Sequence, residues 1–331
     1  MGSRPLSAAG GLTFRMPDPR PLLTLAHSPD PDDAFMWWPI TGKVRPDGTL
    51  IAPPTIDTGR FRFQAVPADI EVLNRRAAAA ADLDITALSF RAWGQVRDKY
   101  VVTSTGSSFG EGFGPKVIAR PDSEKVHCIN CLGKDGVRIA VPGKRTTAFL
   151  VLGMILGRER AAEEERIVEM PFEQIIGAVA RGEVDAGLVI HEGQLLYEQA
   201  GLKLMVDLGA WWKEQTGLPL PLGCNAVRRD LNARFGAGAL AEVSATLRRS
   251  VDYALEHRRE SLEYTMPFAL ANSAMPGGSG APTLERVDEY VRMYVNRWTV
   301  DMGAEGLAAV QRLFDEGERA GLCDTFVVDA I

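Results

Sequence analysis

Hydrophobic positions follow two spacings from Leu22 onward. Short runs rich in β-branched residues predict strands, and stretches of helical periodicity separate them. Strands are predicted over residues 22–26, 61–66, 83–88, 100–103, 116–119, 137–141, 167–169, 184–190 and 203–206. Helices are predicted over residues 68–81, opened by Pro67, and over 146–156, 172–180 and 194–199. This alternation indicates βαβ units and parallel sheets.

The pattern changes after about Asp230. Long helices are predicted over residues 239–257, 259–270, 284–298 and 306–320, with a Pro-Gly-Gly-Ser-Gly loop at 276–280. The chain is therefore predicted to be α/β over its first two thirds and helical over its last third.

The composition narrows the class of protein. Of the 331 residues, 46% are hydrophobic and 24% are charged, which is typical of globular proteins and excludes a disordered or collagen-like chain. The net charge of −6 offers no basic surface to nucleic acid. No stretch approaches the roughly 18 consecutive apolar residues of a spanning helix. We therefore expect no nucleic-acid partner and no membrane insertion.

The N-terminal residues and the cysteines bear on the compartment. Residues 1–20 lack the apolar stretch of a secretory signal peptide and are predicted to form a flexible N-terminal extension. Four cysteines are too few for a disulfide scaffold in a chain of this length. A cytoplasmic location with reduced thiols is the resulting expectation.

The first candidate for chemistry is the Pro- and Asp-rich segment 27–35, which follows a predicted strand and precedes a helical pattern. Ser28, Asp32 or Asp33 is expected to cap that helix through a side-chain oxygen. The same junction has the exposed N–H groups of an anion site, so a ligand-facing role stays open. The glycine and distal glutamate of a calcium loop are missing, so no metal site is predicted there.

Two further segments resemble nucleotide-binding motifs only in part. Residues 107–115 contain glycines at the wrong spacing for a dinucleotide fingerprint, and they predict either a connection close to a ligand or a plain surface turn. Residues 141–149 open a helix, but Arg145 stands where a phosphate loop has Ser or Thr. Thr146 and Thr147 are predicted either to cap this helix or to offer donors to a carboxylate.

His191 follows the apolar run 184–190. Ligands of open α/β sheets bind beyond the carboxyl ends of the strands. An imidazole with its ordinary pKa of about 6.5 suits a proton acceptor at neutral pH. Two interpretations stay open, a catalytic base and a structural histidine.

The remaining conspicuous residues are cysteines and tryptophans. His127, Cys128 and Cys131 match part of a zinc site or a redox pair, but the other two cysteines are isolated, so ordinary thiols in an inserted loop are expected. Two tandem tryptophan pairs stand at 37–38 and 211–212. One tryptophan of each pair is expected in the core, and the other could line a cleft.

Several of these segments together resemble the 1,4-dihydroxy-6-naphthoate synthase family of the futalosine route to menaquinone. The resemblance runs with gaps from about Leu22 to Asp230, over residues 141–149, 170–172, 182–192, 206–212 and 217–223. Its most specific piece is Asp-Ala-Gly-Leu-Val-Ile-His-Glu at 185–192. The C-terminal helices are compatible with the family without being diagnostic of it.

The resemblance implies a two-lobed α/β fold similar to that of periplasmic solute-binding proteins of type II, with C-terminal helices. The larger lobe is then expected from residues 21–115 and 222–331, and the smaller lobe from 116–221. It also implies a lyase that converts cyclic dehypoxanthine futalosine, a small anionic substrate, to 1,4-dihydroxy-6-naphthoate and a three-carbon sugar fragment. No cofactor and no metal are expected, and the oligomeric state is left open.

The resemblance also implies roles for particular residues. The proton-accepting histidine falls on His191, which would start a C–C cleavage driven by aromatisation. The substrate-contacting positions fall on Ala87, Leu88, Ser89, Thr147 and Ala148. Of these, Ser89 and Thr147 are expected to anchor polar oxygens of the substrate, together with nearby backbone N–H groups.

One motif departs from the family pattern. The usual Ser-Pro-Cys-Pro-Asn-Asp-Thr-Phe reads Ser-Pro-Asp-Pro-Asp-Asp-Ala-Phe at residues 28–35. The added negative charge would repel an anionic substrate unless it points away, which leaves open a divergent member with an altered substrate. Two alternative functions are also kept, a solute-binding protein of the same fold for a small anion and a sister enzyme such as chorismate dehydratase.

Overall fold

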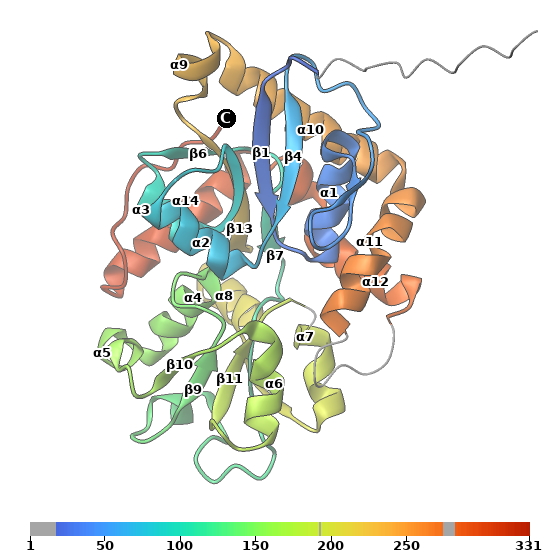
Figure 1. The fold of residues 1–331 in the computed structure, drawn as a ribbon. Helices are drawn as coiled ribbons and strands as arrows, with labels where there is room; N and C mark the ends of the chain where they lie inside the picture. Colours follow the sequence, from blue (N-terminus) through green and yellow to red (C-terminus); the bar gives the residue numbers. More distant parts are fainter. Residues whose placement is uncertain (1–17, 192, 274–281) are drawn as a thin grey trace, which may run out of the picture.

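The computed structural model describes residues 18–191, 193–273 and 282–331, and it has two α/β lobes that lie one above the other in Figure 1. Residues 1–17 of the predicted extension, Glu192 and the predicted loop 276–280 lie outside the described residues. Arg20, at the end of that extension, donates hydrogen bonds to Thr58 Oγ1 at 3.1 Å and to Gly59 O at 2.9 Å.

The larger lobe contains a mixed sheet with the strand order β4-β1-β5-β13-β6, and β7 also pairs with β13. The parallel strands are β1 (Leu22–His27), β4 (Arg62–Pro67) and β5 (Ile85–Ser89). β13 (Leu220–Arg228) runs antiparallel to β5, to β6 (Tyr100–Val102) and to β7 (Ser108–Gly110). A separate hairpin joins β2 (Lys43–Val44) and β3 (Leu50–Ala52). Because β1 and β5 are parallel neighbours, their carboxyl ends open at the same edge of the sheet.

The smaller lobe contains a sheet with the strand order β10-β9-β11-β8-β12. β9 (Ile139–Val141), β10 (Ile167–Glu169) and β11 (Ala186–Val189) are parallel. β8 (Lys116–Ala119) runs antiparallel to β11 and to β12 (Lys203–Asp207). The predicted strand 184–190 is thus shorter than expected, and its last residue lies beyond the sheet.

The chain crosses between the lobes in two segments that lie against each other. One runs from β7 to β8, and the other runs from β12 through α8 (Leu208–Thr216) to β13. A Cβ atom on Gly209 would lie 1.9 Å from the carbonyl oxygen of Phe113. Only glycine therefore allows this close approach of the two crossing segments.

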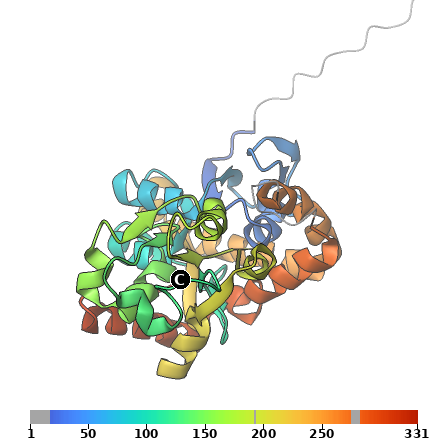
Figure 2. The same ribbon diagram turned by 90° about the horizontal axis from the view of Figure 1, so that it is seen from below.

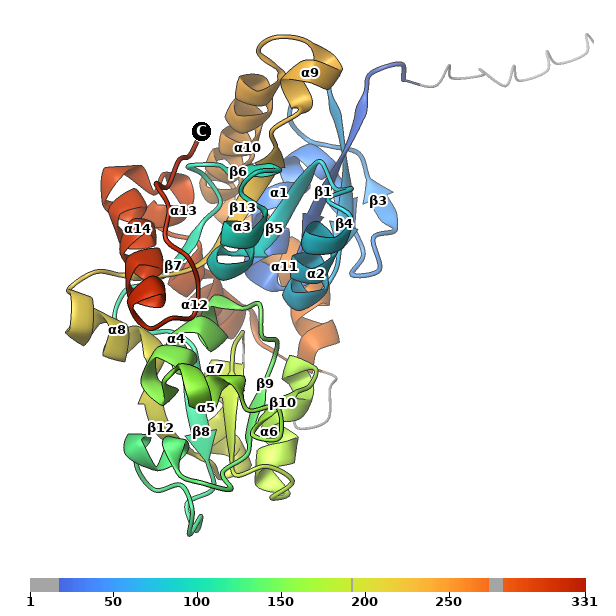
Figure 3. The ribbon, with the colours of Figure 1, turned by 90° about the vertical axis from the view of Figure 1, so that its left-hand side faces the viewer.

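Helices cover both faces of the larger sheet. α1 (Pro31–Thr41) packs against α10 (Ala239–Glu256), α11 (Arg258–Ser273) and α12 (Leu284–Tyr294) on one face. α2 (Ile70–Ala79) and α3 (Phe90–Val96) cover the other face, as Figure 3 shows. The remaining helices of this lobe are α9 (Leu231–Phe235), α13 (Arg297–Val300) and α14 (Gly303–Arg319). Seen from below, α11 and α12 extend beyond the smaller lobe (Figure 2).

Helices also flank the smaller sheet. They are α4 (Thr147–Leu156), α5 (Arg158–Ala162), α6 (Phe172–Ala180) and α7 (Gly193–Leu196), with two short 3₁₀ helices, η1 (Ile129–Gly133) and η2 (Tyr197–Ala200). Leu150 and Val151 of α4 belong to a buried apolar cluster that also contains Trp93 of α3 and Phe314 of α14. One core therefore passes from the smaller lobe into the larger lobe. Within the described ranges, no helix is long and apolar enough to cross a membrane.

The structure corrects three predictions about elements. The predicted helix 68–81 begins at Ile70, because Pro67 ends β4 and Asp69 caps α2 by accepting a hydrogen bond from the N–H of Glu71 at 2.9 Å. The predicted helix 284–298 is broken after Tyr294, where Asn296 starts α13 with a capping box. Of the tryptophan pair at 37–38, neither lines a cleft, since both side chains are fully buried.

Candidate active site

A pocket lies where the two lobes meet. The space between its walls, including the open space at its mouth, is about 820 Å³. The larger lobe contributes the carboxyl ends of β1 and β5, and the smaller lobe contributes the end of β11 and the first turn of α4. The residues that the family resemblance assigned to the site all line it: Ala87, Leu88, Ser89, Thr147, Ala148 and His191.

His191 turns the chain away from β11 with a left-handed backbone, at φ 52°. Such a conformation is uncommon outside glycine, and strained residues of this kind gather at functional sites. The imidazole lines the pocket, and its side chain is 16% exposed. Phe172, the first residue of α6, packs edge-on against the ring with the centroids 4.8 Å apart. The ring is therefore positioned by packing and still open to a ligand.

The carboxylate that contacts His191 comes from the other lobe. Asp30 Oδ2 lies 2.9 Å from His191 Nδ1, and the Asp30 side chain is only 2% exposed. An ionised carboxylate can only accept a hydrogen bond, so this contact places a proton on Nδ1. Nε2 is then the ring atom that would accept a proton from a substrate.

The prediction that Ser28, Asp32 or Asp33 caps the first helix is wrong. The N-cap position of α1 is Asp30, and its side chain makes no capping hydrogen bond. Asp33 Oδ2 instead accepts a hydrogen bond from the N–H of Ser28 at 2.8 Å, so this carboxylate holds the turn that precedes the helix. The turn thereby leaves the Asp30 carboxylate directed across the lobe boundary.

His27 lies beneath this turn and is 2% exposed. Its Nδ1 donates a hydrogen bond to the carbonyl oxygen of Ser28 at 2.7 Å. Burial lowers the pKa of His27 and raises the pKa of the Asp33 carboxyl, and the attraction between the two groups opposes both shifts. Burial thus makes the ionised form of Asp33 less favourable than it is in water.

Ser89 ends β5 and is held by Asn74 of α2. The N–H of Ser89 donates to Asn74 Oδ1 at 3.0 Å, and Asn74 Nδ2 donates to Ser89 Oγ at 3.2 Å. Because the hydroxyl oxygen accepts from Asn74, its own proton can be donated to a ligand in the pocket. The geometry suits the anchoring role expected of this residue.

Thr146 and Thr147 have different tasks at the start of α4. Thr146 Oγ1 caps the helix by accepting from the N–H of Phe149 at 3.1 Å. Thr147 Oγ1 donates to Leu222 O at 2.7 Å and accepts from the N–H of Arg91 at 3.3 Å, so this hydroxyl joins α4 to the larger lobe. The Thr147 hydroxyl is thus engaged within the protein. We therefore expect the backbone N–H groups of this first turn, rather than this hydroxyl, to anchor the substrate.

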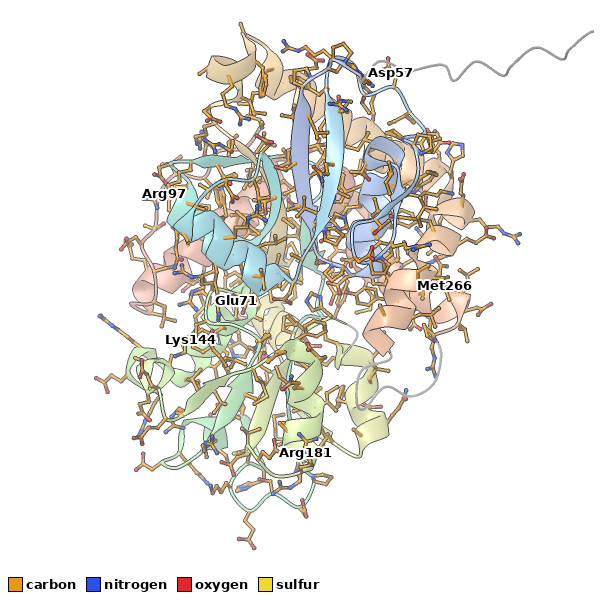
Figure 4. All side chains as sticks on the ribbon, viewed as in Figure 1. Asp57, Glu71, Arg97, Lys144, Arg181 and Met266 are labelled. Carbon is orange, nitrogen blue, oxygen red and sulfur yellow. The ribbon has the colours of Figure 1, made fainter. Side chains whose placement is uncertain are left out.

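Two further contacts join the lobes. Gln194 Nε2 donates to the hydroxyl oxygen of Tyr294 at 2.7 Å, and this hydroxyl donates back to Gln194 Oε1 at 3.0 Å. Arg75 of α2 pairs with Glu169 of β10 at 3.1 Å. Figure 4 shows Glu71 and Lys144 near each other on the two sides of this boundary. The lobes are thus in contact around the pocket.

The lining of the pocket is acidic and rich in hydroxyl groups. Among the described residues that line it, none is Lys or Arg, and the acidic groups are Asp30, Asp32 and Asp33. A carboxylate on a ligand would therefore be held by hydroxyl and backbone N–H donors rather than by a cation.

Sequence reasoning gave no site role to several residues of the pocket lining, among them Asp30, Gln194, Tyr290 and Tyr294. Asp30 had a signal, because it replaces the family's Cys at the end of a strand that neighbours β5. The tyrosines had none, because helical periodicity does not show that α12 reaches the smaller lobe.

Comparisons with known proteins show the family of this chain. The chain matches the family described as menaquinone biosynthesis over residues 23–319. It is 39% identical over 301 residues to a Thermus thermophilus protein named 1,4-dihydroxy-6-naphtoate synthase. These residues cover 91% of this chain and 95% of that protein. A Streptomyces coelicolor protein of the same name is 31% identical over 309 residues, with 93% and 97% covered.

Solved structures confirm the predicted fold. A protein of Archaeoglobus fulgidus is similar with a TM-score of 0.73 at 39% identity, over 91% of this chain and 98% of that one. The alkanesulfonate-binding protein SsuA of Xanthomonas axonopodis pv. citri has a TM-score of 0.58 at 13% identity, over 93% and 96%, which shows the periplasmic-binding-protein-like fold alone. Because the family match and the two named relatives extend over nearly the whole chain, this protein belongs to the menaquinone biosynthesis family.

Proposed function

We propose that this chain is a 1,4-dihydroxy-6-naphthoate synthase, a carbon–carbon lyase acting on cyclic dehypoxanthine futalosine. Two relatives that carry the synthase name, at 39% and 31% identity, support the substrate. The single observation that carries the chemistry is the contact of 2.9 Å between Asp30 and His191 inside a pocket between the lobes.

In the proposed reaction, His191 Nε2 removes a proton from the bound substrate. The carbon–carbon bond to the three-carbon fragment then breaks, and its electron pair enters the ring system that becomes aromatic. His191 returns its proton to one of the two products. No electron leaves or enters the substrate overall, so the reaction needs no oxidant. Asp30 keeps the proton on Nδ1 and stabilises the positive charge that His191 gains.

Binding is proposed to use neutral donors. The hydroxyl of Ser89 and the N–H groups of the first turn of α4 would hold the polar oxygens of the substrate, and Ala87, Leu88 and Ala148 would contact its ring. Since Thr147 joins α4 to Leu222 of the larger lobe, closure of the lobes and placement of these donors would occur together.

The alternative of a solute-binding protein is less well supported. A binding protein needs no imidazole oriented by a buried carboxylate, such as the contact between His191 and Asp30. Chorismate dehydratase, the other alternative, lacks support from the two relatives of this chain named above, both of which are called naphthoate synthases. The division into lobes at 21–115 with 222–331 and at 116–221, and the cytoplasmic location, remain predictions.

The test is to incubate the purified full chain with cyclic dehypoxanthine futalosine and to follow the absorbance of the naphthoate product. The wild-type protein should form the product. His191→Ala should fold normally and lose about 10²–10⁴-fold in kcat, which is the range that a general base contributes.

The matched control is His257→Ala. His257 lies on the larger lobe, where its ring stacks on Tyr253 with the centroids 3.9 Å apart, and it does not line the pocket. This variant should retain full turnover. Full turnover by His191→Ala would remove the mechanism, and no product from the wild-type protein would remove the proposed substrate.

A further inference from the structure

Three metal-ligating side chains gather in the long connection between β8 and β9. His127, Cys128 and Cys131 each place one ligand atom within 4.8 Å of the other two. β8 ends at Ala119 beside Ala186, the first residue of β11, so the connection leaves the sheet at the opposite end from His191. The cluster is therefore separate from the pocket between the lobes.

The backbone around the cluster is well anchored. The N–H of Cys131 donates to the carbonyl oxygen of Cys128 at 3.1 Å, which forms the first turn of η1 and brings the two thiols together. Arg166, which is 3% exposed, donates through Nη1 to the carbonyl oxygens of Leu132 at 3.1 Å, Lys134 at 2.9 Å and Val137 at 3.2 Å. These contacts hold the turn in place without help from the cysteines.

The environment of the two thiols differs. Cys131 is 1% exposed, whereas Cys128 is exposed, and both are free thiols. The cluster thus combines an anchored inner sulfur with an outer sulfur and an exposed imidazole.

We propose that His127, Cys128 and Cys131 bind one Zn²⁺ ion, with water as the fourth ligand. Two thiolates and an imidazole are the ligand types that zinc prefers. Zinc bonds of about 2.3 Å to sulfur and 2.0–2.1 Å to nitrogen require tetrahedral ligand atoms roughly 3.5–3.8 Å apart, so the three atoms need to approach by only about 1 Å. Binding releases the remaining thiol protons to solvent, and no electron is transferred.

A disulfide between the two cysteines is the competing use of the same thiols. A disulfide would give the imidazole no role, although the ligand atom of His127 also lies within 4.8 Å of both sulfur atoms. The dependence on His127 therefore separates a metal site from a redox pair. The ion would tie the exposed imidazole to the start of η1, which is a structural role independent of the proposed lyase activity.

The experiment titrates the full chain, purified without oxygen and reduced with a phosphine, with Co²⁺ and then Zn²⁺. One equivalent of Co²⁺ should produce thiolate-to-cobalt charge-transfer bands and the strong visible bands of tetrahedral cobalt, and Zn²⁺ should abolish them. Cys128→Ser/Cys131→Ser should lose these bands and bind at least about 100-fold more weakly, since even second-shell changes cost 10–100-fold. Cys323→Ser, outside the cluster, is the matched control and should titrate like the wild type.

His127→Ala keeps both thiols, so it tests the site even if the double serine variant fails to fold. It should keep thiolate charge-transfer bands but bind Zn²⁺ about 10-fold or more weakly in competition with a chromogenic chelator. The proposal is overturned if the wild-type chain gives no thiolate bands, if the double serine variant keeps them, or if His127→Ala competes for Zn²⁺ as well as the wild type.

Discussion

Two residues from different lobes meet at the centre of the pocket, and local structure explains how each is directed there. Asp30 holds the N-cap position of α1, and its side chain makes no capping hydrogen bond but lies 2.9 Å from His191. His191 leaves β11 in the left-handed conformation, which points the ring back toward the sheet edge. Neither feature depends on a bound ligand.

Replacing Asp30 with Asn tests its part in orienting the imidazole. The amide removes the negative charge that stabilises the protonated ring, so kcat should fall by about 10²–10⁴-fold while KM changes little. Asp69→Asn is the matched control, because Asp69 also stands at a helix N-cap but caps α2 outside the pocket. Steady-state kinetics on both variants give the answer, and unchanged kcat in Asp30→Asn would exclude the orienting role.

The buried imidazole of His27 should make the free energy of unfolding depend on pH. Burial lowers its pKa in the folded state, so the unfolded chain binds the proton more readily once the pH falls below about 6.5. The free energy of unfolding should therefore fall between pH 7.5 and pH 5.5, by at most about 1.4 kcal/mol, which is the limit for a folded-state imidazole that takes up no proton. His27→Asn, whose amide can replace the donor to Ser28, should show a smaller loss over the same range. Urea unfolding of both proteins at the two pH values measures this loss of unfolding free energy. An equal loss in the wild type and in His27→Asn would show that His27 is not its source.

At the scale of elements, the pattern of the chain predicts most of what the structure contains. β8, β10 and α6 have the bounds that periodicity and composition predict. The predicted bounds are wrong where tertiary contacts determine where an element ends. Pro67 belongs to β4 rather than to the following helix, and α12 ends at Tyr294, which contacts Gln194 of the other lobe. The contact between Asp30 and His191 could not be predicted, because it depends on how the two lobes dock.

The start of α4 allows capping to be separated from ligand binding. Thr146 and Thr283 both cap a helix through a side-chain oxygen, but only Thr146 lines the pocket. Each change to Ala should cost about 0.5–2 kcal/mol of unfolding free energy. Thr146→Ala should also raise KM by about 2–10-fold, as expected for loosening donors worth 0.5–1.5 kcal/mol. Chemical denaturation with steady-state kinetics checks both, and an equal rise of KM in Thr283→Ala would refute the local explanation.

At the scale of the whole molecule, the lobes are joined differently on two sides. A continuous apolar core through Leu150 and Phe314 links them along α4 and α14, whereas polar contacts link them around the pocket. Polar contacts exchange readily with water, and an apolar core does not. We therefore expect opening to occur at the polar contacts.

Tyr294→Phe tests that expectation. It removes both hydrogen bonds to Gln194, which is 3% exposed, and the unsatisfied amide should weaken the joined arrangement by roughly 1.4 kcal/mol, or about tenfold in KM. Tyr264→Phe is the matched control, because that hydroxyl bonds to Val44 within the larger lobe. It should lower the unfolding free energy and leave KM unchanged, and a similar KM in both variants would mean that the Gln194 contact does not govern binding.

The division of the imidazole and its carboxylate between two lobes has a consequence for timing. While the lobes are apart, the ring exchanges its proton between both nitrogens with water, and no atom is set aside to act as the acceptor. The reactive tautomer is selected only as solvent is shut out, so a molecule that enters and leaves without being enclosed would depart unchanged. Closure of the lobes, rather than the basicity of the ring, would then determine when bond breaking begins.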